Sequence, residues 1–257
     1  MQTIDIRHQL NLYGRKIGIT LFLFFLLGIS AMAQDDYKPL NKSGQDNQFI
    51  SYGFFLAGHN SSLRLKYSDA YMDPNADYSN IQSIMPIFSP GFSLGFLITT
   101  RLHDQFNFLI TPKVGFYEFQ TDINYLKDDD FEETGVGVNT ETIVTEMTMV
   151  ELPLIFKYKS HRFNNTRMFF TGGVNPQFRT KSQEEADADD LVLTGSDIAL
   201  ELGMGFDFYF KFFKFSPEIR FSHGMKNLYK EETSNPEFSG AISEIRRKSI
   251  TLYLNFQ

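Results

Sequence analysis

Large apolar side chains recur at every second position in segment after segment of this chain, and this period constrains the fold more than any other feature. In the clearest case, residues 198–210, Ile, Leu, Met and Phe alternate with Ala, Glu, Gly, Asp and Tyr. A period of two places alternate side chains on the two faces of a β-strand, and no segment sustains the 3.6-residue period of a helix. An eighth segment, 49–58, is apolar on both faces but has similar length and aromatic content. The seven alternating segments are 92–101, 106–117, 150–159, 168–179, 198–210, 213–222 and 249–257.

The connections between these eight segments alternate in length. Short links lie near His103 and Asp104, at 161–166, and at Lys211 and Phe212. Hairpins of a membrane barrel are short turns at one rim and long loops at the other. The pattern predicts an all-β fold, an eight-stranded antiparallel up-and-down β-barrel over residues 48–257, with both termini at the short-turn rim. The predicted long outer loops are 59–89, 120–146, 180–196 and 224–247.

A soluble sandwich or a lipocalin-like barrel also alternates apolar and polar faces along its strands. The size of the side chains on the two faces distinguishes a membrane barrel from these soluble folds. Here the apolar face is uniformly large, whereas the other face mixes Gly, Ser and Thr with charged residues. Eight strands enclose too little space for so many Phe and Leu side chains. We therefore expect the apolar face to point outward into lipid, which makes the chain an outer-membrane type transmembrane barrel.

Charged residues on the small-residue face are then predicted to point into the lumen. Four are basic and four acidic, so their charges sum to zero. Because unpaired charges in a narrow interior are costly, we expect salt bridges and hydrogen bonds that close the lumen, with a proton or ion path as the alternative. The predicted network is Arg101, Lys113, Glu151, Lys157, Glu201, Asp207, Glu218 and Arg220.

Four prolines fall inside predicted strands, although a closed barrel has no free edge to tolerate them. Pro112, Pro176 and Pro217 each precede Lys, Gln or Glu, and Pro153 lies in the fourth strand. We interpret them as bulges or strand bends.

The N-terminus has the pattern of a secretory signal peptide. Three basic residues precede an apolar stretch at 17–29 that ends in Ala31-Met32-Ala33. The stretch is short for a membrane-spanning helix, so we expect 1–33 to be cleaved and 34–47 to form a polar, flexible periplasmic leader. Cleavage removes three of 24 basic and one of 31 acidic residues, which leaves a net charge of −9 and makes nucleic acid an unfavourable partner.

Residues that carry chemistry are sparse. His59 and His223 end two strands near Ser222 and Asp69, but neither lies in a catalytic motif, so we expect no enzyme. The acidic runs at 128–133 and 184–190 lack the spacing of a calcium loop and are interpreted as solvated charge, with weak cation binding or bridging to lipopolysaccharide as the alternative. We predict no cofactor or metal site.

Several segments resemble the PorT/SprT family of outer-membrane barrels. They are Glu151-Leu-Pro-Leu-Ile-Phe-Lys-Tyr-Lys, Thr171-Gly-Gly-Val-Asn, Gly203-Met-Gly-Phe-Asp and Lys214-Phe-Ser-Pro-Glu-Ile-Arg. The resemblance covers the chain from about Gln48 onward, and it implies a non-enzymatic accessory role in type IX protein secretion and gliding motility. Since an eight-stranded barrel is too narrow for folded cargo, we expect that role to be assembly or binding to a larger translocon subunit. The alternative is a stand-alone porin-like or adhesin-like barrel.

Overall fold

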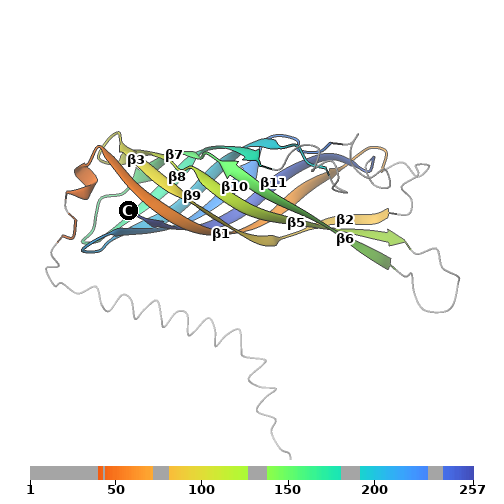
Figure 1. The fold of residues 1–257 in the computed structure, drawn as a ribbon, viewed down its shortest axis with the longest axis horizontal. Helices are drawn as coiled ribbons and strands as arrows, with labels where there is room; N and C mark the ends of the chain where they lie inside the picture. The colour runs from red at the N-terminus through yellow and green to blue at the C-terminus, as the bar shows by residue number, and fades with distance from the viewer. Residues whose placement is uncertain (1–39, 43, 72–80, 127–137, 181–191, 231–239) are drawn as a thin grey trace, which may run out of the picture. The chain divides into compact units, whose positions relative to one another are not determined.

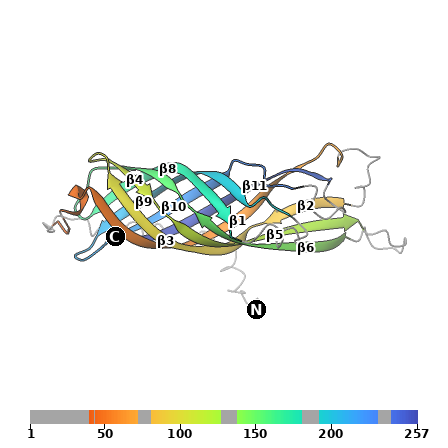
Figure 2. The ribbon, with the colours of Figure 1, turned by 45° about the horizontal axis from the view of Figure 1, so that its top comes forward.

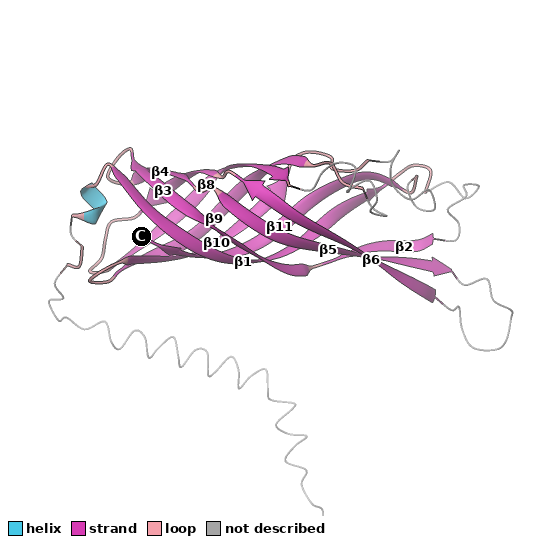
Figure 3. Cartoon of the chain, in the orientation of Figure 1, coloured by secondary structure: helices cyan, strands magenta, loops and turns pink. Residues whose placement is uncertain are grey.

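The structure is a computed structural model that describes residues 40–42, 44–71, 81–126, 138–180, 192–230 and 240–257. The predicted signal peptide, the first part of the leader and both acidic runs lie outside these ranges. Within them, the only helix is a short 3-10 turn, η1 (Gln45–Asn47), and nearly everything else is strand (Figure 3). No described helix is long and apolar enough to cross a membrane.

The strands of the described part close into one antiparallel ring of eight, as predicted (Figures 1 and 2). Three of the eight are each interrupted once and so count as two elements: β2 with β3, β4 with β5, and β6 with β7. The ring closes because β1 pairs with β3 on one side and with β11 on the other. The bounds are β1 (Ile50–Tyr67), β2 (Ile81–Ile87), β3 (Ser89–Arg101), β4 (Phe106–Ile110), β5 (Lys113–Leu126), β6 (Val138–Glu151), β7 (Leu154–Lys159), β8 (Thr166–Arg179), β9 (Ser196–Tyr209), β10 (Lys214–Gly224) and β11 (Ile242–Phe256).

The strand pairing has no bulge at the four prolines, so of the two interpretations, bulges or strand bends, the first is wrong. The pairing of β4 and β5 with their neighbours keeps one register on both sides of Pro112, and the same holds for β6 and β7 around Pro153. The proline carbonyls still accept backbone hydrogen bonds: Phe96 N–H donates to Pro112, Thr111 N–H to Pro153, and Leu152 N–H to Pro176, at 3.0–3.1 Å. Each proline therefore removes one donor from the ladder without inserting a residue.

Strands extend into three of the predicted long loops, which corrects their boundaries. Strands occupy part of 59–89 through β1 and β2, part of 120–146 through β5 and β6, and part of 224–247 through β11. The period of two continues there, but the faces are exchanged. Leu63 and Ile123 point inward and are buried, while Arg64 is exposed. Each strand was predicted to end where its outward apolar face ends. The parts of the strands beyond that point were therefore predicted as loops.

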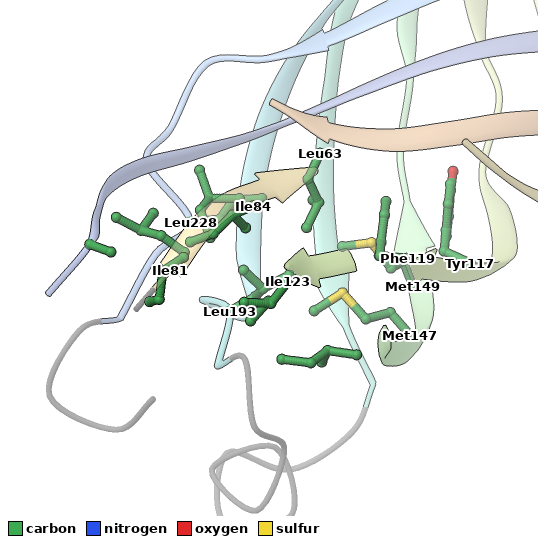
Figure 4. Close-up of a cluster of buried hydrophobic side chains, with 14 residues drawn as sticks. Leu63, Ile81, Ile84, Tyr117, Phe119, Ile123, Met147, Met149, Leu193 and Leu228 are labelled. Carbon is green, nitrogen blue, oxygen red and sulfur yellow. The ribbon is translucent and has the colours of Figure 1, made fainter. Parts of the chain in front are cut away.

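The inward side chains beyond the outward apolar band form a hydrophobic core of their own. Figure 4 shows side chains from β1, β2, β5 and β6 gathered with Leu193 and Leu228 from the connecting segments. This cluster, called the outer core here, fills the barrel at its long-loop end. Its buried members are Leu63, Ile81, Ile84, Tyr117, Phe119, Ile123, Ile143, Met147, Met149, Leu193, Leu228, Ala241, Ile242 and Ile245.

The outward face carries the apolar band expected of a membrane barrel. In β9, Leu200, Leu202, Met204 and Phe206 are 45–59% exposed, while Glu201 and Asp207 between them are at most 1% exposed. Apolar side chains left this exposed over a whole wall need an apolar solvent.

Candidate functional site

The lumen collects seven of the eight charged residues predicted to line it. Each is 5% exposed or less, because each alternates along its strand with an outward apolar side chain. They come from β5, β6, β7, β9 and β10, so four of the eight strands meet through them, because β6 and β7 are parts of one strand. The seven are Lys113, Glu151, Lys157, Glu201, Asp207, Glu218 and Arg220.

Five of these side chains form one layer, called the central layer here. Lys113 Nζ lies 3.1 Å from Glu151 Oε2, and Arg220 lies 2.9 Å from both Glu201 and Glu218. The Asn175 amide joins the two groups, since its Nδ2 donates to Glu151 at 2.5 Å and to Glu201 at 2.6 Å. Every charge of this layer therefore has an opposite charge in contact, which is what makes burial tolerable.

Neutral polar side chains complete the central layer. Gln177 donates to Glu151 at 2.9 Å, Thr171 donates to Glu218 at 2.5 Å, and Tyr117 also donates to Glu151. The Lys113 ammonium donates to the Tyr253 hydroxyl at 2.9 Å. These contacts hold the carboxylates in place by hydrogen bonds as well as by charge.

A second, smaller layer lies nearer the short-turn end. Lys157 Nζ is 2.7 Å from Asp207 Oδ1, which also accepts a 2.5 Å hydrogen bond from Ser216. The Lys157 ammonium lies 3.5 Å from the Phe169 ring centroid. A separate cluster of buried apolar residues also lies in the barrel: Phe55, Ala57, Leu97, Leu109, Ile155 and Tyr253. The lumen thus contains charged and apolar layers, with the outer core at the far end.

Arg101 is the predicted network member that the structure places elsewhere. It ends β3 at the short turn, where its guanidinium pairs with Asp104, and these side chains are 30% and 75% exposed. The Arg101 guanidinium holds the pKa of that carboxyl below its usual range. A charge at the last residue of a strand reaches water, so period alone overestimates how deeply it is buried.

Among the described residues, four charged residues of the interior were not predicted. Lys159 and Lys214 follow the inward phase of β7 and β10 and are buried, so the alternation itself could have found them. Arg247 lies 3.4 Å from Asp197, and both are buried. These two fell in or beside predicted loops, where no inward face was assigned.

The described part of the leader is bound to the barrel, which corrects its interpretation as flexible. The Tyr209 hydroxyl donates to Asp46 at 2.9 Å, and Asp46 lies 3.6 Å from Arg167 and 3.9 Å from Arg162. Asn41 N–H also donates to the Asn165 side chain at 2.9 Å. Asn41 and Asp46 therefore attach the described part of the leader to the short-turn rim.

The two histidines considered for catalysis do not share a site. His59 points inward, is 5% exposed and stacks on Tyr117 with ring centroids 4.1 Å apart. His223 has the opposite phase from the buried Arg220 in β10, so it lies on the outer face. Among the described residues, no group of three or more His, Asp or Glu is placed to hold a metal ion.

Comparisons with known proteins identify the family. Residues 32–230 match the family described as outer membrane protein beta-barrel domain. Similar solved structures include OprG from Pseudomonas aeruginosa, at 12% identity and a TM-score of 0.40, covering 80% of this chain and 94% of that one. Neisserial surface protein A is 8% identical with a TM-score of 0.41, covering 81% and 98%.

The attachment invasion locus protein Ail of Yersinia pestis is 10% identical with a TM-score of 0.33, covering 81% of this chain and 99% of that one. Among curated proteins, none matches this sequence. The family match spans more than half of the chain, so this chain belongs to the outer membrane protein beta-barrel domain family and is a small outer-membrane β-barrel protein.

Proposed function

We propose that this chain is a non-conducting outer-membrane barrel that acts by binding a partner protein rather than by transport or catalysis. The observation that carries the proposal is the filled lumen. Arg220, Glu201 and Glu218 pair within the interior, and the outer core occupies the long-loop end. An ion would have to break these pairs and enter an apolar layer, and both steps are costly. Activity is therefore assigned to the rims and the outer wall.

We further propose that the bound partner is a larger subunit of the type IX secretion translocon, and that the chain is an accessory component needed for secretion and gliding. The support for this finer role is the PorT/SprT resemblance of segments in β6 to β10, including Lys214-Phe-Ser-Pro-Glu. The rival role, a stand-alone porin-like or adhesin-like barrel, predicts no secretion defect.

The proposed orientation places both termini and the short turns in the periplasm. It is supported by the short links at the rim where the leader binds, the usual periplasmic arrangement of such barrels. The chain has no cysteine, so a single introduced cysteine reports unambiguously on exposure. An impermeant maleimide on intact cells should label Lys66→Cys and leave Lys211→Cys unlabelled. The reverse labelling would overturn the orientation.

Two experiments test the functional proposal. In planar bilayers, purified protein should give no steady conductance, and a large persistent open state would contradict the closed lumen. In cells, deletion of the gene should abolish export of cargo and surface spreading, and a tagged copy should co-purify with a large outer-membrane subunit. Normal secretion in the deletion strain would favour the stand-alone barrel.

A further inference from the structure

The outward face of β11 changes chemistry abruptly beyond the apolar band. Leu252 and Ile250 are 48% and 45% exposed, and the next side chains of the same phase are Lys248 and Arg246. Since strands rise about 3.3 Å per residue, Lys248 lies within about 7 Å of Ile250 along the strand. Lys248 therefore lies at the boundary of the apolar band, where lipid headgroups begin.

The neighbouring strand β1 places further cations at the same height. The register pairs Arg64 directly with Arg246, Lys66 with Glu244, and Ser62 with Lys248. Like charges directly opposite on a sheet destabilise it. The outward cations of these two strands form a group, called the basic ladder: Arg64, Lys66, Arg246 and Lys248.

The protein itself supplies little negative charge to the basic ladder. Glu244 accepts a hydrogen bond from Arg246, and Lys248 lies 4.9 Å from the Phe88 ring centroid. Within the described residues, no carboxylate forms an ion pair with Arg64 or Lys66. A partly open pocket of about 250 Å³ lies against these two strands, lined by Arg64, Leu65, Lys66, Glu244 and Arg246.

A ladder of outward side chains farther around the wall has the opposite charge. On β5 and β6 the outward side chains beyond the band include Glu118, Asp122 and Glu146, and Glu118 faces Glu146 in the register. The outward cations and the outward anions are thus on different strands. An anion at this height is attracted to β1 and β11 and repelled by β5 and β6.

We propose that the basic ladder binds the phosphate group of an outer-leaflet lipid whose acyl chains lie against the apolar band below it. Paired guanidinium groups suit phosphate because they donate parallel hydrogen bonds to its oxygens. Basic residues at the membrane boundary attract anionic headgroups in the same way. A phosphate between Arg64 and Arg246 removes their mutual repulsion. The inference rests on the proposed orientation, which places this ladder in the outer leaflet.

The test is a titration of purified mature protein, in neutral detergent, with phosphorylated lipid A and with the same lipid A after removal of its phosphate. We expect the phosphorylated form to bind at least about tenfold more tightly. Arg64→Gln/Arg246→Gln should bind both forms alike. Arg101→Gln/Lys211→Gln removes the same charge at the opposite end, and Glu118→Gln/Glu146→Gln alters the acidic ladder, so both should retain the preference. Circular dichroism establishes that each variant is folded.

Equal binding of the two lipid A forms by the wild type would overturn the proposal, as would an unchanged preference in Arg64→Gln/Arg246→Gln. Inorganic phosphate is the competitor that separates a lipid site from a free-anion site. If it displaces lipid A at comparable concentration, the site takes free phosphate and the lipid proposal fails. Secretion and partner co-purification are not read in this titration, so its failure leaves the proposed partner-binding role standing.

Discussion

Lys113 and Glu151 lie directly opposite each other on β5 and β6, and their charged atoms are 3.1 Å apart in the barrel interior. Glu151 also accepts hydrogen bonds from Tyr117, Asn175 and Gln177. The pair therefore links the neighbouring strands β5, β6 and β8 along the inner wall of the barrel.

Removal of one partner of this pair should be far more damaging than removal of both. Lys113→Met leaves Glu151 buried without its cation, and we expect a loss of about 3 to 5 kcal/mol in the free energy of unfolding. Lys113→Met/Glu151→Gln should recover much of that loss. Urea unfolding in lipid vesicles measures both variants. Equal destabilisation by the single and double variants would show that the ion pair is not what the site requires.

The inside-out arrangement of the band predicts a depth-dependent cost for an outward charge. Met204 lies near the middle of the outward apolar run of β9 and is 50% exposed. Met204→Arg should lower the free energy of unfolding in vesicles by about 2 to 4 kcal/mol, because its guanidinium enters hydrocarbon. The matched control, Phe212→Arg, lies on a short turn at a side chain 79% exposed, and should cost about 1 kcal/mol or less. Similar costs for both changes would contradict the assignment of a lipid-facing wall.

The membrane wall was predictable from sequence because one physical signal dominates it. From Ile198 to Phe210 every outward side chain is large and apolar, and the inward ones are small or charged except for Tyr209, so a period of two fixes strand, face and lumen residues together. The same signal assigns Glu201 and Asp207 to the lumen face, and both are buried in the structure.

Beyond the membrane the apolar side chains of each strand point inward instead of outward, and the predicted strand ends and loops were wrong there. Leu63 and Ile123 turn inward into the outer core, while the outward face becomes polar as in a soluble sheet. A pattern of outward apolar residues therefore predicts a loop where the strand in fact continues. Contacts such as Asp46 with Tyr209 join residues 163 positions apart, and no local pattern encodes them.

Close packing of the lumen around Gly203 predicts that a single added methyl group is harmful. A Cβ atom at this position would lie 2.7 Å from Thr171 Oγ1, 2.8 Å from the Ile219 carbonyl and 3.0 Å from Glu218 Oε1. Gly203→Ala should therefore lower the free energy of unfolding by about 1 to 3 kcal/mol through overpacking. A Cβ at Gly58 would meet no atom within 4 Å, so Gly58→Ala is the control and should be nearly neutral. A neutral Gly203→Ala would mean that the central layer is looser than its contacts indicate.

The leader is predicted to be released from the rim when the carboxylate of Asp46 is neutralised. Asp46 accepts the Tyr209 hydroxyl and lies within 4 Å of Arg162 and Arg167, so Asp46→Asn removes the charge that both arginines approach. Amide hydrogen exchange at residues 44–48 should then become faster by at least about tenfold. A tenfold increase corresponds to a decrease of about 1.4 kcal/mol in the free energy of local opening. Exchange in β9 and β10 should stay slow, because their ladder is independent of the leader. Glu146→Gln neutralises an exposed carboxylate on β6, which does not contact the described part of the leader, and should leave leader exchange unchanged. Unaltered exchange in Asp46→Asn would show that Asn41 and its partner Asn165 hold the leader without help from the ion pairs.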